Sequence, residues 1–268
     1  MNYIQISYLD LAFATSLVVV TLLISFKEKL GMEKDLLIGA FRSFVQLMFV
    51  GYILQYIFDT NHWYLVLAVL LTMIGVAGFN ALKRQKIRWK KLFWILTIGI
   101  ALGSIIILTI VIGFILRVKP WYLPQYIIPL AGMIIGNSMV GAALAANRLT
   151  SDIRDHRREI EVALSLGASS RQAVAPYLRE ALKTAMMPTI STMMTVGIVQ
   201  LPGMMTGQII AGTNPNAAVR YQIVVTYMIA AATAITVITV TLWLYRCFFT
   251  PNHQLLTEPG NCSIISNK

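Results

Sequence analysis

The sequence predicts an all-α protein that crosses a membrane several times. Of its 268 residues, 57% are hydrophobic and only 12% are charged, whereas a soluble domain carries about 25% charged residues. The apolar residues form long unbroken runs rather than short periodic stripes, which is typical of helices surrounded by lipid. The Lys and Arg residues cluster between these runs, as in polytopic membrane proteins.

Seven apolar runs are long enough to cross a bilayer, which takes about 20 residues as helix. The predicted spans are 8–26, 36–57, 63–82, 92–116, 126–146, 184–210 and 219–245. We expect the first run to be retained, because the seven residues before it contain no basic residue and a signal peptide needs one. The spans together predict one transmembrane domain over residues 1–250, followed by a short disordered tail at residues 251–268.

The distribution of basic residues predicts the orientation of the chain. Of the 22 Lys and Arg residues, 18 lie after the first, third and fifth runs and in the C-terminal tail, and three lie on the opposite side. The positive-inside rule therefore places the N-terminus outside and the C-terminus in the cytosol, in the plasma (inner) membrane. The same distribution explains the net charge of +11 without a nucleic-acid partner, and it favours contact with anionic lipid.

The connection between the fifth and sixth runs, at about residues 148–183, is much longer than the rest. Most connections between neighbouring helices need only about 2–8 residues. Side chains suited to begin its two helices stand at Ser151, Asp152, Ser169 and Ser170. Gly167 is expected to end the first helix in a left-handed conformation, and the second helix is expected over residues 171–182. The segment thus predicts a helix, a turn and a helix at the cytosolic surface, suited to contact a cytosolic partner.

The stretch Glu161-Val-Ala-Leu-Ser-Leu-Gly167, continued to Val174, is similar to the EAA loop of ABC-importer permeases. Glu161, Ala163 and Gly167 match the motif positions, and Val162 replaces the first alanine of the motif. The resemblance implies a coupling helix that docks into a groove on a separate ATP-binding subunit.

Three further blocks, in order along the chain, resemble the FetB-type permease family. They are residues 128–139, residues 201–212 followed by Asn214-Pro215, and Arg220-Tyr-Gln222. The resemblance implies an ABC permease subunit that exports iron or a related metal, with plant relatives connected with aluminium tolerance. We expect it to work as a homodimer with a separate ATPase.

The chain contains no G-x-x-x-x-G-K-[ST] phosphate loop. We therefore expect it not to be an enzyme itself and to carry no cofactor. ATP and Mg²⁺ would be bound by the partner subunit.

Polar residues within the predicted spans are candidates for a translocation path, because such groups are costly in lipid. Arg42 and Gln46 are four residues apart and share a helix face, although Arg42 is also placed to snorkel to the headgroups. Asn137 and Ser138 follow Gly132-x-x-x-Gly136, a spacing that indicates either a tight helix interface or a path-lining segment.

The sixth run is predicted to be a broken helix. Pro188 lies near its start and Pro202-Gly203 stands within it, and such breaks in transporters mark gates or binding sites. The path candidates around the break are Gln200, Pro202, Met204, Met205 and Gln208. Thioether sulfur binds soft metals weakly, whereas methionine more often fills apolar gaps, so no metal ligand is assigned.

No carboxylate lies deep in any predicted span. This disfavours a proton-coupled carrier, and it disfavours a bare ferric ion as cargo, since that ion prefers anionic oxygen. We expect a chelated metal, or passage through transient amide and carbonyl contacts. Two alternatives stay open: an ABC permease for another cargo such as a nucleotide sugar, whose negative charge Arg42 would suit, and a non-ABC channel or secondary carrier.

Overall fold

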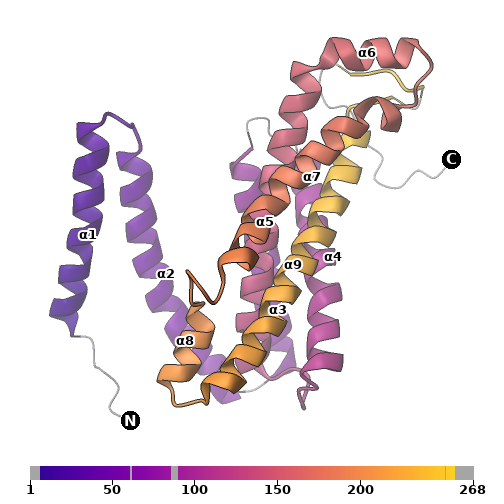
Figure 1. Ribbon diagram of the computed structural model, residues 1–268. Coiled ribbons are helices and arrows are strands. Elements are labelled where there is room, and N and C mark those ends of the chain that lie inside the picture. The colour runs from indigo at the N-terminus through magenta and orange to yellow at the C-terminus, as the bar shows by residue number, and fades with distance from the viewer. Residues whose placement is uncertain (1–6, 61, 86–89, 251, 257–268) are drawn as a thin grey trace. The chain divides into compact units, whose positions relative to one another are not determined.

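The computed structural model of the chain describes residues 7–60, 62–85, 90–250 and 252–256, and the regular elements in these ranges are helices (Figure 1). The chain divides into two compact units, Met1–Asn61 and His62–Lys268. The predicted all-α, multi-pass membrane class is confirmed. The single domain expected over residues 1–250 stays a prediction.

The first unit is a hairpin of α1 (Tyr8–Lys27) and α2 (Glu33–Thr60). Helix α1 begins where expected because Ser7 and Asp10 form a capping box: the Ser7 hydroxyl accepts the Leu9 N–H at 3.2 Å, and the Asp10 carboxylate accepts the Ser7 N–H at 2.9 Å. At the turn between the helices, the Ser25 hydroxyl donates to a Glu33 carboxylate oxygen at 3.0 Å.

The second unit is a helical bundle arranged around α5 (Pro124–Asp155). Helix α5 packs against α3 (Trp63–Lys83), α4 (Lys90–Ile110), α7 (Ser170–Thr195) and α9 (Pro215–Arg246). A short π-helical turn, η1 (Val111–Ile115), continues α4. The core of the bundle is aliphatic, and its largest fully buried side chains are Leu92, Ile95, Leu96, Ile100, Leu130, Ile134, Leu149, Ile160 and Leu244.

Glycines bring α4 close to α9. A Cβ at Gly103 would lie 2.2 Å from the Thr236 hydroxyl and 2.7 Å from the Ala232 carbonyl oxygen, and one at Gly99 would lie 2.5 Å from Val240 Cγ2. The spacing Gly99-x-x-x-Gly103 puts both on one helix face. Gly132-x-x-x-Gly136 makes no such close contact within the described part of this chain, because a Cβ at Gly136 meets nothing within 4 Å. The alternative, a path-lining segment, stays a prediction.

The segment after α5 forms α6 (Arg157–Ser165), α7 (Ser170–Thr195) and α8 (Gly203–Ile210). The cap predicted at Ser151 or Asp152 was wrong, because α5 continues to Asp155 and the break falls at His156. The second helix also runs beyond the predicted end at residue 182.

The predicted break in the sixth run is present but begins earlier than expected. Helix α7 continues through Pro188 and ends at Thr195, and residues 196–202 form a non-helical segment before α8. Proline at 188 is tolerated because the helix around it is held by packing, with Ala185 and Thr189 buried.

Five helices of the described residues are long and apolar enough to cross a membrane: α2, α3, α4 with η1, α5 and α9. The apolar part of α1, Phe13–Lys27, is shorter, and the sixth predicted span corresponds to the end of α7, the break and α8. The number seven and the orientation therefore stay predictions.

Candidate functional site

A two-helix projection, which we call the elbow (residues 156–178), lies at one end of the second unit. Helix α6 lies across the end of the bundle there, between the ends of α5 and α7 (Figure 1). Gly167 has φ +90°, the left-handed conformation expected of the turn. Ser169 and Gln172 then form a capping box that begins α7, so the turn has a defined geometry at both of its ends.

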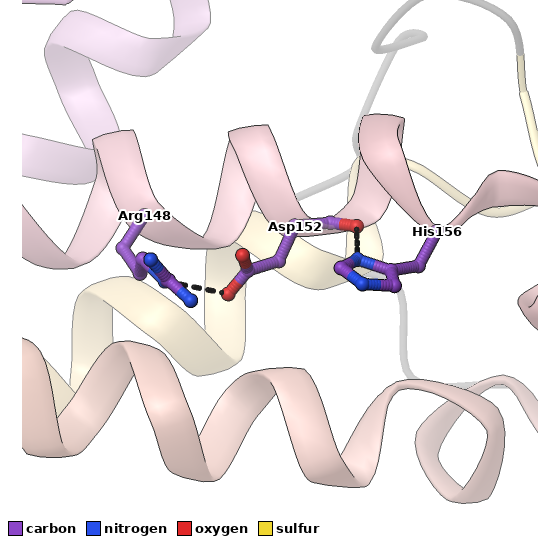
Figure 2. Close-up of polar contacts among 3 residues, drawn as sticks. All are labelled: Arg148, Asp152 and His156. Carbon is purple, nitrogen blue, oxygen red and sulfur yellow. Dashed lines mark hydrogen bonds and ion pairs between the residues drawn. The ribbon is translucent and has the colours of Figure 1, made fainter.

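Two polar contacts lie at the end of α5, where the chain enters the elbow. The Arg148 guanidinium donates to the Asp152 carboxylate at 3.0 Å, and Asp152 is only 5% exposed. The His156 Nδ1 atom lies 3.1 Å from the Asp152 carbonyl oxygen (Figure 2). Both contacts follow the i, i+4 spacing of a helix. The ion pair lies within α5, and the His156 contact joins the first residue of the elbow to the end of that helix.

A second contact joins α6 to α7. The Tyr177 hydroxyl donates to a Glu159 carboxylate oxygen at 2.7 Å, and the His156 and Tyr177 rings lie with centroids 4.8 Å apart. Burial, followed by the hydrogen bond to Glu159, raises the pKa of Tyr177 to about 12. The phenol therefore stays protonated and keeps donating throughout the physiological pH range.

The two faces of α6 differ sharply. Ile160 is 1% exposed, and Ala163 and Leu164 pack against the main core. On the other face, Val162 is 59% and Leu166 is 85% exposed. Two apolar side chains thus stand on the outside of a braced projection, with no partner among the described residues that would bury them.

The three motif residues expected to couple to a partner have different positions. Glu161 pairs with Arg157 at 2.8 Å and stays on the surface, and Gly167 forms the turn. Ala163 is partly buried and packs against the main core, and its coupling role stays a prediction. The sequence analysis did not predict that Val162 and Leu166 lie on the surface. They are four residues apart, on the helix face away from Ile160, and this spacing could have identified them.

The C-terminal segment touches the elbow. Phe249 and Leu255 form an isolated bridge, and His253 contacts both the backbone N–H and the hydroxyl of Ser170 at the start of α7. Residues 252–256 of the predicted tail therefore lie beside the elbow. The other residues of that tail, 251 and 257–268, lie outside the described residues.

A cavity of about 320 Å³ lies beside the break. We call it the break cavity. It is lined by α5, α7, α8 and α9 together with residues of the segment 196–202. Its lining residues are Met133, Asn137, Thr189, Thr192, Met193, Val196, Gln200, Pro202, Gly203, Met204, Gln222, Val225, Thr226 and Ile229. A second cavity of about 420 Å³ shares five of these residues: Met193, Val196, Pro202, Gln222 and Thr226.

The break cavity is uncharged, and its lining mixes polar side chains with a larger apolar part. Amides, threonine hydroxyls and thioethers line it, and none of its lining residues is ionisable. Within the described ranges no cluster of three or more His, Cys, Asp or Glu side chains is suited to hold a metal ion. The cavity therefore offers hydrogen bonds and soft apolar contacts rather than anionic ligands.

The structure brings together some of the predicted path residues. Asn137, Gln200, Pro202 and Met204 line the break cavity, and Met205 lines the second one. Ser138 is fully buried, and Gln208 contributes to neither cavity. Arg42 and Gln46 lie on α2, in the other unit. Gln222 was not predicted as a cavity residue. It lies near the start of the seventh run, where a polar residue usually indicates only the end of a membrane span.

The helices and the break define a polytopic α-helical membrane protein with a polar cavity at an interrupted helix. The chain belongs to the family described as "Uncharacterised protein family (UPF0014)", which matches residues 8–249. No solved structure matches the chain.

Three relatives cover nearly the whole chain. It is 41% identical to "Probable iron export permease protein FetB" of Escherichia coli (strain K12), over 96% of this chain and 97% of that protein. It is 37% identical to "UPF0014 membrane protein STAR2" of Oryza sativa subsp. japonica, over 90% and 84%. It is 35% identical to "Protein ALUMINUM SENSITIVE 3" of Arabidopsis thaliana, over 91% and 89%.

Proposed function

We propose that this chain is the membrane-spanning subunit of an ABC transporter that exports iron or a related metal, driven by a separate ATP-binding subunit. The observation that carries the proposal is the elbow, where Val162 and Leu166 are exposed on a projection whose two helices are joined by the Tyr177–Glu159 hydrogen bond. Exposed apolar side chains on a rigid support are what a docking groove requires. The Escherichia coli relative, a probable iron export permease, supports the cargo.

In the proposed cycle, two ATP-binding subunits hold ATP and Mg²⁺ and move the elbow as they close. Because α7 runs without interruption from Ser170 to Thr195, displacement of its first turn is transmitted to the break. The break cavity lies at that end of α7, so the motion changes access to it. No covalent chemistry is required of this chain.

We further propose seven crossings, with the N-terminus outside and the C-terminus cytosolic in the plasma (inner) membrane. The distribution of Lys and Arg supports this orientation. The five apolar helices supply five crossings, α1 supplies another, and the end of α7 with the break and α8 supplies the last. The elbow then faces the cytosol, where ATP is available.

The break supports a homodimer. Counted along α7 from Lys183, Thr195 lies about 18 Å further on at 1.5 Å per residue, beyond the middle of a hydrocarbon core about 30 Å thick. Non-helical backbone at that depth is tolerated only against protein or a water-filled cavity. Ile198 is 90% and Val199 is 80% exposed, so we propose that a second copy of the chain covers them.

The alternative cargo, a nucleotide sugar, gains no support from the described cavities. A diphosphate needs cationic partners, and none of the residues lining the break cavity or the second cavity carries a charge. Arg42, the cation that would suit it, lies in the other unit.

The test is transport by the chain reconstituted in proteoliposomes with its ATP-binding subunit, with iron and a nucleotide sugar offered separately. We expect iron movement that requires ATP and the second subunit. Iron movement without ATP would establish a channel or secondary carrier, and ATP-dependent movement of the nucleotide sugar alone would establish the other cargo.

A further inference from the structure

The chain folds back after α9 and returns to the elbow. We call this segment the strap (residues 248–256 except 251). Its two arms are paired by backbone hydrogen bonds. The Leu256 N–H donates to the Phe248 carbonyl oxygen at 2.8 Å, and the Thr250 N–H donates to the Gln254 carbonyl oxygen at 2.9 Å. The strap is therefore a closed turn with a defined backbone rather than a loose end of the chain.

Apolar contacts hold the strap against the same core as the elbow. Phe248 is 6% exposed, and Phe249 and Leu255 pack against the main core cluster. That cluster also contains Val174 of the elbow and Leu244 near the end of α9. The strap therefore lies where the elbow and the end of α9 share one core.

His253, in the strap, reaches the start of α7. Its Nδ1 atom accepts the Ser170 N–H at 3.3 Å, and it also contacts the Ser170 hydroxyl. The first N–H groups of a helix have no partner within the helix, and Ser170 is only 8% exposed. A side chain 83 positions further along the chain thus supplies the acceptor for this N–H.

The backbone of His253 has an unusual conformation. Its φ is +59°, in the left-handed region, which few residues other than glycine adopt and where Asn, Asp and His are enriched. Such conformations persist where the surrounding structure holds them, and they are concentrated at functional positions. Here the paired arms of the strap and the contact with Ser170 hold His253 in place.

Helices α7 and α9 connect the elbow end of the bundle to both cavities. The two helices pack along each other (Figure 1), and Met193 of α7 and Thr226 of α9 line each cavity. Helix α7 starts at the elbow and ends at the break, whereas α9 starts near the cavities and ends at the strap. A link between the start of α7 and the end of α9 therefore joins two walls of the cavities at their far ends.

We propose that the strap is this link and that His253 is its positioning residue, so that displacement of the elbow moves α9 together with α7. The inference rests on the proposed function for what displaces the elbow. It adds a second route from the elbow to the cavities, through α9. Without the link, the elbow would move only the wall that α7 contributes.

The first test is hydrogen exchange and mass spectrometry on the full-length chain in lipid nanodiscs, without ATP, iron or the second subunit. His253→Gly accepts the left-handed backbone but removes the acceptor. His253→Asn keeps both, because Asn also adopts this conformation and its side-chain oxygen accepts a hydrogen bond. We expect exchange over residues 170–176 to become about five-fold faster in His253→Gly, as loss of one hydrogen bond predicts. His253→Asn should stay close to the unchanged chain.

The matched control is Gln254→Gly, which introduces the same flexibility at the neighbouring exposed residue and should leave exchange over residues 170–176 unchanged. Equal exchange in His253→Gly and the unchanged chain would overturn the proposal. Equally fast exchange in Gln254→Gly would also overturn it, because backbone flexibility rather than the His253 acceptor would then be responsible.

The second test measures iron moved per ATP hydrolysed by the complex in proteoliposomes. A general loss of stability lowers transport and hydrolysis together and leaves this ratio unchanged. We expect His253→Gly to keep hydrolysis and to lower the ratio about five-fold, and His253→Asn to restore it. An unchanged ratio in His253→Gly would show a purely structural contact and overturn the coupling role. Absence of iron movement by the unchanged complex would refute the proposed function alone, because the exchange results support or overturn the link by themselves.

Discussion

The Tyr177 hydroxyl donates a 2.7 Å hydrogen bond to Glu159, and this contact joins α6 to α7 across the turn of the elbow. The two residues are 18 positions apart, and the side chain of Tyr177 also lies against His156. The elbow is therefore braced by side chains from both of its helices and from the end of α5. A force applied to α6 is passed to α7 through this contact as well as through the backbone.

Tyr177→Phe should loosen α6 while leaving the bundle folded. The change removes one hydrogen bond, which contributes about 1 kcal/mol to stability, and keeps the aromatic ring. We expect amide exchange in α6 to become about five-fold faster, with little change in α3 or α9, when measured by hydrogen exchange and mass spectrometry. Equal protection of α6 in both proteins would show that the contact does not brace the elbow.

The raised pKa of Tyr177 gives a pH dependence with a definite sign. An ordinary tyrosine titrates near 10, and burial beside Glu159 raises the pKa of Tyr177 to about 12. The contact therefore stabilises the fold fully below pH 10 and is lost as the pH rises through 12. Ultraviolet difference titration against Tyr177→Phe should reveal one tyrosinate transition near pH 12. A difference transition near pH 10 would contradict the described surroundings of the phenol.

Gly103→Ala should destabilise the bundle. The new Cβ would lie 2.2 Å from the Thr236 hydroxyl and 2.7 Å from the Ala232 carbonyl oxygen, so α4 and α9 must separate, at a cost of about 1–3 kcal/mol. Gly136→Ala is the control, because a Cβ there meets nothing within 4 Å. Thermal unfolding in detergent should show a clear loss of stability for the first variant only. Equal stability of both variants would refute the close approach of α4 and α9.

The proposed dimer contact predicts a cross-link at the break. A photoreactive benzoylphenylalanine in place of Val199 should yield a covalent dimer on irradiation in membranes. The control position is Phe114, also strongly exposed but away from the break. An intramolecular cross-link from position 199 to the α1–α2 hairpin would keep the mass of one chain. That result would show that the chain covers its own break.

Local sequence patterns predict much of the fold. Apolar runs predicted α1, α2, α3, α4 with η1, and α9 to within a few residues. Gly167 and Ser169 predicted the turn of the elbow, because each has a specific backbone or capping role. The continuation of α5 to Asp155 was not predicted, because Ser151 and Asp152 are residue types that commonly cap the start of a helix. Burial of Asp152 against Arg148 instead keeps them within the helix.

The candidate site was only partly predictable, because its members depend on which helix faces meet. Asn137 and Gln200 were identified as polar residues in apolar runs, and the fold brings them to one cavity. Gln222 and the close packing at Gly99 and Gly103 depend on the placement of α9 against α4 and α5. A single sequence does not specify that placement. Nor did the motif distinguish Ala163, which packs inward, from Val162 and Leu166, which face outward.

The most direct test of the proposed coupling uses ATP hydrolysis stimulated by iron in the complex with the ATP-binding subunit. Leu166 is 85% exposed, so Leu166→Asp should leave the chain folded and inserted while placing a charge in an apolar contact, and Leu166→Met should preserve that contact. We predict that Leu166→Asp weakens association with the ATP-binding subunit and lowers the rate of iron-stimulated hydrolysis, each at least ten-fold. Leu166→Met should keep both values near those of the unchanged protein. Full association and stimulation in Leu166→Asp would contradict the elbow as the site of coupling.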